Sequence, residues 1–409
     1  MGVPSLKTLI VSLIMVSALP CAHADRDTPL PYGFLLASAE AQPVATDRPT
    51  VNSEAMVALS RARESISALE AARGPYHPGL AQPLLAAAAL AREMRFDEAA
   101  IELYSWALQN LRINRGLATP EQLPVVEALL ELHREAGDSE AVNNREAYIY
   151  RLAGRGQRPW SEDRLRAALR YLAWWQEWLL LKGEWYDGRE LWDLHRAGEA
   201  LAESVCAAEA WAQEWCGPMT LRALGTLYLI DYQIEPIDDF GDPRRLRRRP
   251  DWDQDMFDQR LYDLAASAYA AGVRLLQTAL ERVPDDPDLK LALADWRWFQ
   301  GRQSSAREDY RALQAEMPAR FVEPEPLPTL PVFRRDPRLA RDSDRVILRV
   351  KVTARGQARE VEFTGPETVE EGVRIRARRA LRDTRFRPRL NANGEPEDAE
   401  VTLSLLALR

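Results

Sequence analysis

The feature that most constrains the fold of this chain is an internal repeat. The turn sequence at Gly74–Pro78 returns as Gly116–Pro120, an offset of about 42 residues. The same offset pairs Leu90 with Leu132, Arg92 with Arg134, Glu93 with Glu135 and Ala99 with Ala141. Repeats of roughly 20–50 residues are typical of solenoids, whose units bury their apolar stripes against one another. The sequence therefore predicts stacked helical hairpins over residues 51–318.

Two later segments show the same helix–turn–helix pattern. In one, Gly183 ends a helix and the segment Glu184–Gly188 opens the next. In the other, Gly301 is the turn between two helices, and Pro284 and Pro318 give a shorter period of about 34 residues. Both segments resemble ordinary tetratricopeptide repeats. The resemblance makes Ala306 the small close-packing position and Tyr310 the aromatic one, and His195 stands in the second helix of the earlier unit where that family usually has a small residue.

The longer unit resembles the tetratricopeptide variant of kinesin-light-chain-like proteins, and the later units resemble ordinary tetratricopeptide repeats. This resemblance implies a mainly α solenoid whose concave surface holds a protein or a peptide.

The N-terminus has the organisation of a secretory signal. Lys7 is the charged residue, Thr8–Leu19 is the apolar run, and Ala22–Ala24 is a small-residue cleavage site. The apolar run of about 12 residues is shorter than the roughly 20 that a membrane-spanning helix needs. We expect residues 1–24 to be removed after Ala24, so that the chain acts in the periplasm and residues 25–50 form a loose leader. The alternative is a retained inner-membrane anchor.

Export changes the reading of the cysteines. Cys21 leaves with the signal, and Cys206 and Cys216 remain. An even pair in an oxidising compartment predicts a disulfide. Two buried free thiols are the alternative.

The composition gives no indication of catalysis. The chain has 409 residues, 46% of them hydrophobic and 28% charged, with a formal net charge of −8. This balance is ordinary for a globular protein and does not favour nucleic-acid binding. His77, His133 and His195 have no metal-ligand spacing. We expect no enzyme activity, no cofactor and no metal.

Two local patterns have a structural and a functional interpretation. Tyr171, Trp178, Trp185 and Trp192 are spaced by seven, which favours core packing over a ring-stacking groove for glycans such as peptidoglycan. The basic run Arg244–Arg249 lies in an Asp-rich stretch and is interpreted as a solvated loop, with docking of an acidic partner as the alternative.

A Pro-rich stretch separates the helical part from the C-terminal part. Residues 319–340 contain its stiffest portion, Val322–Pro328. Such segments favour extended polyproline geometry at about 3.1 Å per residue. We expect a linker able to hold two domains tens of ångströms apart.

Residues 341–409 alternate apolar and polar side chains, which predicts an antiparallel sheet with one buried face. A helix at Val373–Asp383 would cover that face and keep its arginines outside. The inward sheet positions are Val346, Leu348, Val350, Val352, Val361, Phe363, Val401, Leu403 and Leu405, those of the helix Val373, Ala377, Ala380 and Leu381, and the outer arginines Arg374, Arg376, Arg378 and Arg379.

This order of elements over residues 346–409, with Arg385–Pro388 after the helix and Gly394–Pro396 before the last strand, resembles the C-terminal domain of the TonB energy-transducer family. The resemblance implies a small α+β domain that contacts outer-membrane transporters, partly by pairing with an extended segment. The last strand, Val401–Leu408, is the candidate edge. The candidate partner-binding residues are Val401, Leu403, Leu405, Arg385 and Arg387. A closed domain, or a dimer through this edge, is the alternative.

Together these patterns predict a non-enzymatic periplasmic adaptor that joins a helical-repeat scaffold to a strand-adding domain. Its partners would be proteins or peptides of the cell envelope, with an outer-membrane transporter as one candidate, and no nucleic acid. No stable membrane span is expected after cleavage, and the oligomeric state is left open. The alternative functions are a TonB-type energy transducer with a retained anchor and a peptidoglycan-binding envelope protein.

Overall fold

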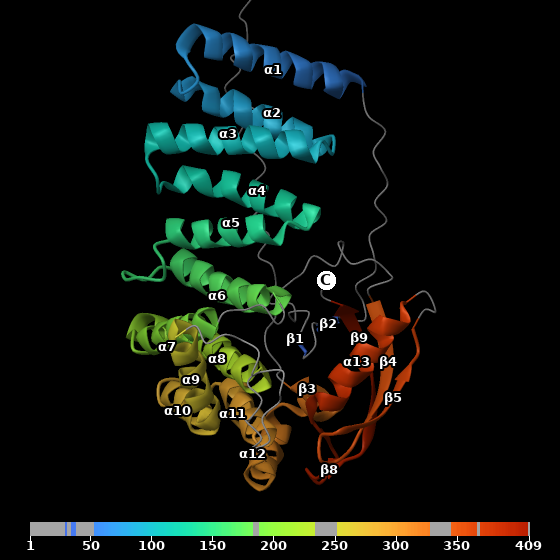
Figure 1. The fold of residues 1–409 in the computed structure, drawn as a ribbon. Helices are drawn as coiled ribbons and strands as arrows, with labels where there is room; N and C mark the ends of the chain where they lie inside the picture. Colours follow the sequence, from blue (N-terminus) through green and yellow to red (C-terminus); the bar gives the residue numbers. More distant parts are fainter. Residues whose placement is uncertain are drawn as a thin grey trace, which may run out of the picture.

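The computed structural model describes residues 29–30, 34–37, 53–182, 188–233, 252–327, 345–365 and 369–407. Over these residues the protein is mainly helical, with a small sheet region in its C-terminal part (Figure 1). The predicted signal with Ala24, the ring of Trp185, the basic run Arg244–Arg249 and residues 328–340 lie outside the described residues.

The sequence repeat is a repeat of helices. The helices α2 and α4 begin at equivalent positions of the two units, as do α3 and α5, and each pair follows a short 3-10 helix. Proline opens both 3-10 helices, where its missing N–H costs nothing. The bounds are α1 Ser53–Arg73, η1 Pro78–Leu80, α2 Ala81–Glu93, α3 Asp97–Arg115, η2 Pro120–Gln122, α4 Leu123–Ala136 and α5 Ser139–Leu152.

The chain continues through further helices to residue 316. The helices α1 to α6 are stacked one above another, and the later helices gather at the lower end of that stack (Figure 1). The turn at Gly301, with a φ of +75°, joins α11 to α12 as the sequence predicts. The bounds are α6 Glu162–Lys182, α7 Gly188–Cys206, α8 Glu209–Gln233, α9 Trp252–Ala266, α10 Ala268–Leu280, α11 Pro287–Phe299 and α12 Gln303–Glu316.

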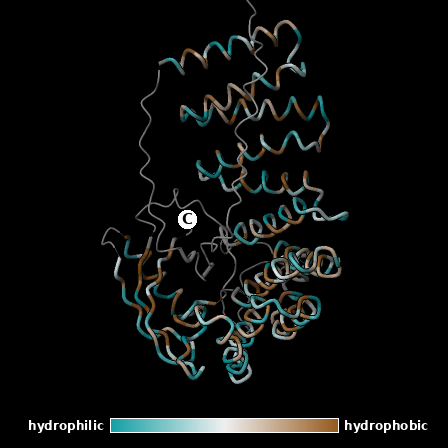
Figure 2. The backbone as a smooth tube through the Cα atoms, turned by 180° about the vertical axis from the view of Figure 1, so that it is seen from behind, coloured by the Kyte–Doolittle hydropathy of each residue, from teal (hydrophilic) through white to brown (hydrophobic). Residues whose placement is uncertain are grey.

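Aliphatic and small residues fill the space between neighbouring helices, because small side chains let the helices approach closely. The colouring of Figure 2 shows apolar and polar stretches alternating along each helix. One cluster of buried residues joins α1 to α6 and a second joins α6 to α9. A third extends from the end of α7 through α12 and includes Leu327 and Leu390, so the last part of the helical core continues into the C-terminal segment.

The predicted disulfide between Cys206 and Cys216 is confirmed. It joins the last residue of α7 to α8 across a sequence separation of 10 residues. Both cysteines are buried within the helical core. None of the helices among the described residues is long and apolar enough to cross a membrane.

The C-terminal part is an antiparallel sheet with one helix packed on it. The main sheet has the order β1-β2-β9-β4-β5, and α13 covers its apolar face. All the predicted inward positions of the sheet and the helix belong to this core, which confirms the alternation argument. The bounds are β1 Pro29–Leu30, β2 Phe34–Ala37, β4 Arg345–Val352, β5 Ala358–Phe363, α13 Glu371–Asp383, β6 Arg385–Arg387, β7 Arg389–Leu390, β8 Pro396–Glu397 and β9 Ala399–Ala407.

Two expectations about the connecting segments are wrong for the residues that are described. The leader is not wholly loose, since β2 pairs with β9 and β1 pairs with β2. The start of the Pro-rich stretch is not a spacer, because it forms η5 (Pro318–Phe321) and β3 (Glu325–Leu327), and β3 pairs with β6. Burial of Phe321 and Leu327 in the helical core holds this segment against the last helices, so it does not act as a spacer.

Candidate protein-interaction site

The sheet domain is fixed to the last helical hairpin by a buried ion pair. The Arg387 guanidinium donates from one terminal nitrogen to Asp295 Oδ2 at 2.8 Å and contacts the Glu325 carboxylate with the other. Tyr310 donates its hydroxyl to Asp295 Oδ1 at 2.8 Å. The Arg387 side chain is 0% exposed and that of Asp295 2%. We call the contacts between the α11–α12 hairpin and the sheet domain the junction.

Backbone groups of β6 complete the junction. Trp298 of α11 donates its indole N–H to the carbonyl oxygen of Phe386 at 2.8 Å. Arg385 donates to the carbonyl oxygen of Phe299 and lies over its ring at 5.3 Å. Gly356 has a φ of +72°, and a Cβ at this position would lie 2.6 Å from the Trp298 indole nitrogen. The close approach of strand and helix therefore needs glycine at 356.

Further along α12, two more contacts tie the helix to the turn between β7 and β8. Gln314 donates its side-chain amide to the carbonyl oxygen of Asn391 at 3.0 Å, and Arg311 pairs with Glu395. The junction therefore extends over the whole α11–α12 hairpin.

Burial raises the pKa of two acidic groups near the junction. It raises the pKa of the Tyr310 hydroxyl well above its usual value, and the neighbouring Asp295 carboxylate adds to this effect. Tyr310 therefore keeps its proton as a donor. Burial also raises the pKa of Asp231, while the hydrogen bond from Gln300 and the charge of Arg385 oppose that shift.

The structure corrects the predicted roles of the two arginines. Arg387 is buried against Asp295 and Glu325, so it holds the chain to itself instead of presenting its charge to a partner. Arg385 binds the end of α11 but stays exposed. The alternation of β6 explains this arrangement, because Phe386 enters the sheet core while its two neighbours point the other way.

The three apolar candidates on β9 also have internal positions. Val401, Leu403 and Leu405 point into the core under α13 and are at most 8% exposed. A partner that added to β9 would therefore meet its main chain and the outward residues. Of those, Glu400 and Thr402 are exposed.

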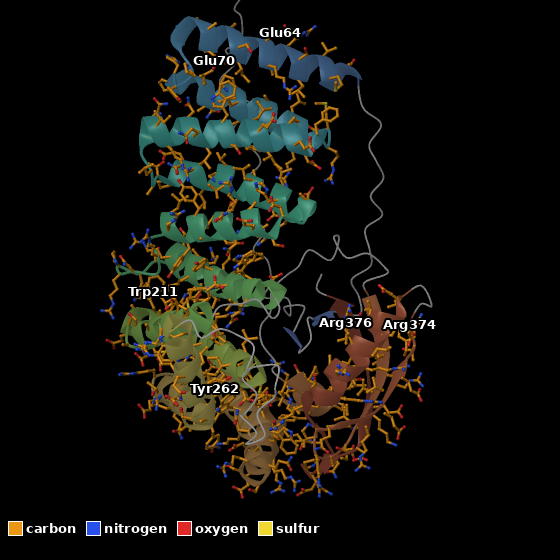
Figure 3. All side chains as sticks on the ribbon, viewed as in Figure 1. Glu64, Glu70, Trp211, Tyr262, Arg374 and Arg376 are labelled. Atoms are coloured by element: carbon orange, nitrogen blue, oxygen red, sulfur yellow. A yellow bond between two sulfur atoms is a disulfide. The ribbon has the colours of Figure 1, made fainter. Side chains whose placement is uncertain are left out.

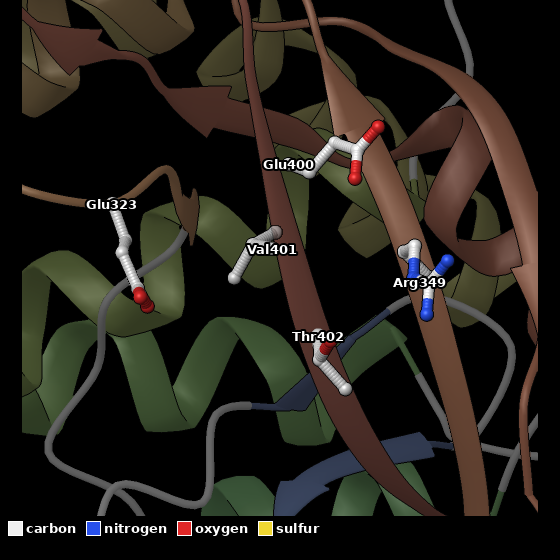
Figure 4. A pocket seen from close by; sticks show the side chains of 5 residues that line it. All are labelled: Glu323, Arg349, Glu400, Val401 and Thr402. Carbon is white, nitrogen blue, oxygen red and sulfur yellow. The ribbon is translucent and has the colours of Figure 1, made fainter.

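The predicted free edge is half covered. Along one side, β9 pairs with β4 from Ala399 to Leu406. On the other side, β2 pairs only with Ser404–Ala407. A hollow of about 240 Å³ adjoins the part that β2 leaves open and is lined by Glu323, Arg349, Glu400, Val401 and Thr402 (Figure 4).

Helix α13 adds a basic surface next to the sheet. Arg374 and Arg376 lie near its N-terminal end (Figure 3). Arg376 and Arg379 are exposed as predicted, whereas Arg374 and Arg378 are half-buried. Arg374 lies over the ring of Phe363 at 4.3 Å, so part of the predicted charged stripe covers the edge of the core.

The aromatic residues of the Trp-rich region contact other side chains. Tyr171 stacks on Tyr150 with ring centroids 4.4 Å apart. Trp178 packs on Trp174 and against the first helical core. Trp192 lies beside His195, whose pKa is lowered by burial. These contacts support the core-packing interpretation for the rings that are described.

Among the described residues, no group of three or more His, Cys, Asp or Glu is placed to hold a metal ion. No protein-family model matches this chain, and no curated protein matches it in sequence.

Sequence reasoning missed the principal residue of the junction, Asp295. The residue lies on a helix, where a carboxylate is usually solvated. Its one signal is its place on the apolar face of α11, between the buried Ala294 and Trp296.

Proposed function

We propose that this chain is a non-enzymatic adaptor of the bacterial periplasm, in which a tetratricopeptide-like helical scaffold and a TonB-like C-terminal domain bind proteins of the cell envelope. The C-terminal domain binds an extended segment of one partner by strand addition, and the scaffold holds another. The proposal includes export and signal removal after Ala24, with periplasmic protein partners.

The observation that supports the proposal best is the junction. An interaction domain on a flexible tether would leave its arginines solvated. Here Arg387 is fully buried against Asp295, and β3 and β6 pair across the end of the helical stack. A buried ion pair requires defined geometry to offset its desolvation. The two surfaces are therefore held in a fixed relation, which suits a protein that positions two partners relative to each other.

Exposed apolar residues give the scaffold its own candidate surface. Leu117 is 77% exposed, Tyr76 60% and Ile113 49%. Asn114 donates its side-chain amide to the carbonyl oxygen of Tyr76 at 2.9 Å, which holds the turn after α1 against the end of α3. Apolar residues gathered at a turn edge are a typical contact surface for a protein partner.

Site-specific photocrosslinking in cells tests the proposal with the full chain. A photoreactive residue at Thr402 reports on partners at the sheet edge, and one at Leu117 reports on partners of the scaffold. One at the exposed Glu308 of α12 is the matched control. We expect a discrete protein product from Thr402, a different product from Leu117 and none from Glu308. Absence of a product from both Thr402 and Leu117 would contradict the adaptor function.

A further inference from the structure

The two sides of the main sheet differ in how the addition of a further strand is prevented. The sheet has the order β1-β2-β9-β4-β5. At one end, β5 carries the exposed charged residues Arg359, Glu360 and Glu362, and charge on an edge strand discourages the addition of another strand. On the other side, the segment Ser404–Ala407 of the inner strand β9 contains no charged residue. This uncharged edge is the one that β2 covers.

The covering strand is short and distant in sequence. Strand β2 contributes four residues, Phe34–Ala37, and pairs Phe34 with Ala407 and Ala37 with Ser404. By contrast, β4 pairs with β9 along its whole length, from Arg345 to Val352. A short strand contributes few main-chain hydrogen bonds, and the pairing must also close a very long loop. It is therefore more easily displaced from β9 than β4 is.

We propose that the edge Ser404–Ala407 is a strand-addition site, that the chain's own Phe34–Ala37 occupies it in the resting state, and that an extended apolar segment of a protein partner adds there by displacing β2. The resident sequence Phe-Leu-Leu-Ala gives the chemistry that the site accepts, namely uncharged apolar residues running antiparallel to β9. The neighbouring open stretch Ala399–Leu403 and the hollow at Glu323 and Thr402 give an incoming segment a first contact (Figure 4). This inference rests on the proposed function, because it specifies how the sheet recognises its partner.

The direct test measures binding of a labelled synthetic peptide, residues 29–40 of this chain, to the full-length protein. In the first variant, Leu35→Pro/Leu36→Pro, one of the two consecutive prolines removes an N–H that faces β9, because the N–H direction alternates along a strand. The matched control Leu35→Ile/Leu36→Ile keeps every donor. We expect the proline variant to bind the peptide at least about tenfold more tightly than the wild type or the isoleucine control, because the resident strand no longer competes.

A disulfide trap provides an independent reading. Leu35 and Leu406 are direct partners in the register, and substituting this pair leaves the core residue Leu405 intact. The variant Leu35→Cys/Leu406→Cys should lose peptide binding when oxidised and regain the wild-type value after reduction. Wild type treated with the same reductant controls for the native Cys206–Cys216 bond.

Equal peptide affinity of wild type and proline variant, or no binding by either, would overturn the proposal. Undiminished binding by the oxidised cysteine variant would overturn it too, because the peptide would then bind elsewhere. The photocrosslinking at Thr402 reports on partners in cells without reference to β2. A crosslinked partner together with a failed peptide test would therefore leave the proposed function standing and reject only the resident strand.

Discussion

Two buried carboxylates, one in the helical stack and one at the junction, both pair with arginine, but the exposure of the arginine differs. Glu146 of α5 has a side chain 1% exposed and pairs with Arg134 at 2.6 Å and Arg170 at 2.9 Å, whose side chains remain 30% and 34% exposed. Asp295 of α11 pairs with Arg387, which is 0% exposed. The first pairing joins consecutive helices, and the second joins residues 92 positions apart.

The two pairings differ in whether the arginine can return to water when the contact is broken. The arginines around Glu146 can return to water, so the stack depends mainly on its aliphatic packing. Arg387 and Asp295 cannot be separated without taking a buried charge from its counter-ion. We infer that the stack tolerates changes of charge and that the junction does not.

The largest expected effect comes from Arg387→Ala. It removes the guanidinium that pairs with the buried Asp295 carboxylate, and we expect a loss of about 3–5 kcal/mol in the free energy of unfolding, measured by chemical denaturation. The matched control is Arg389→Ala, two residues on, which removes an exposed pair with Glu397 at 2.9 Å. The control should cost about 0–1 kcal/mol. Equal losses for the two variants would contradict the distinction.

The next effect tests the close approach of strand and helix. Gly356→Ala adds a methyl group against Trp298 at a backbone φ of +72°, and we expect a loss of about 2–4 kcal/mol. Gly137→Ala has nearly the same φ, +71°, with no atom within 4 Å of the added Cβ. It should cost about 1–2 kcal/mol. A smaller loss at Gly356 than at Gly137 would show that the junction is loosely packed.

A smaller effect is expected within the stack. Glu146→Ala removes the buried carboxylate, but Arg134 and Arg170 are partly solvated, so the loss should be about 1–3 kcal/mol. Glu131→Ala removes only a surface partner of Arg134 at 3.0 Å and should change stability by less than about 0.5 kcal/mol. If Glu146→Ala destabilised the protein as much as Arg387→Ala, the contrast between stack and junction would fail.

The sequence predicts the contacts between residues that are close in sequence, and it does not predict those between distant residues. The repeat of the first helical hairpins, the alternation in β4 and β9 and the Cys206–Cys216 bond could be predicted, because each depends on neighbours in sequence or on a short loop. The pairing of Arg387 with Asp295 could not, because the local sequence does not show which charges 92 positions apart meet. The same holds for β2, whose partner strand lies at the other end of the chain.

The smallest expected effect is a pH dependence of stability that His195 of the helical stack causes. Burial lowers the pKa of His195 below its ordinary 6.5, although the Glu199 carboxylate opposes the shift. The folded state therefore favours the neutral ring, and the unfolded state binds more protons below about pH 6.5. Stability should fall as the pH drops through about 6.5 and level off below the folded pKa. His195→Gln should flatten the change in Tm between about pH 7.5 and pH 5, and an unchanged slope would contradict this assignment.

The helical stack and the sheet domain form one body through the junction, and their separation can be measured directly. Pulsed electron paramagnetic resonance between spin labels at Glu281→Cys, at the end of α10, and Glu360→Cys, on β5, reports this distance in the full chain with the native disulfide intact. We predict a single narrow distance distribution that broadens when Arg387→Ala is added. A broad distribution before that substitution would show two tethered domains and contradict the single body.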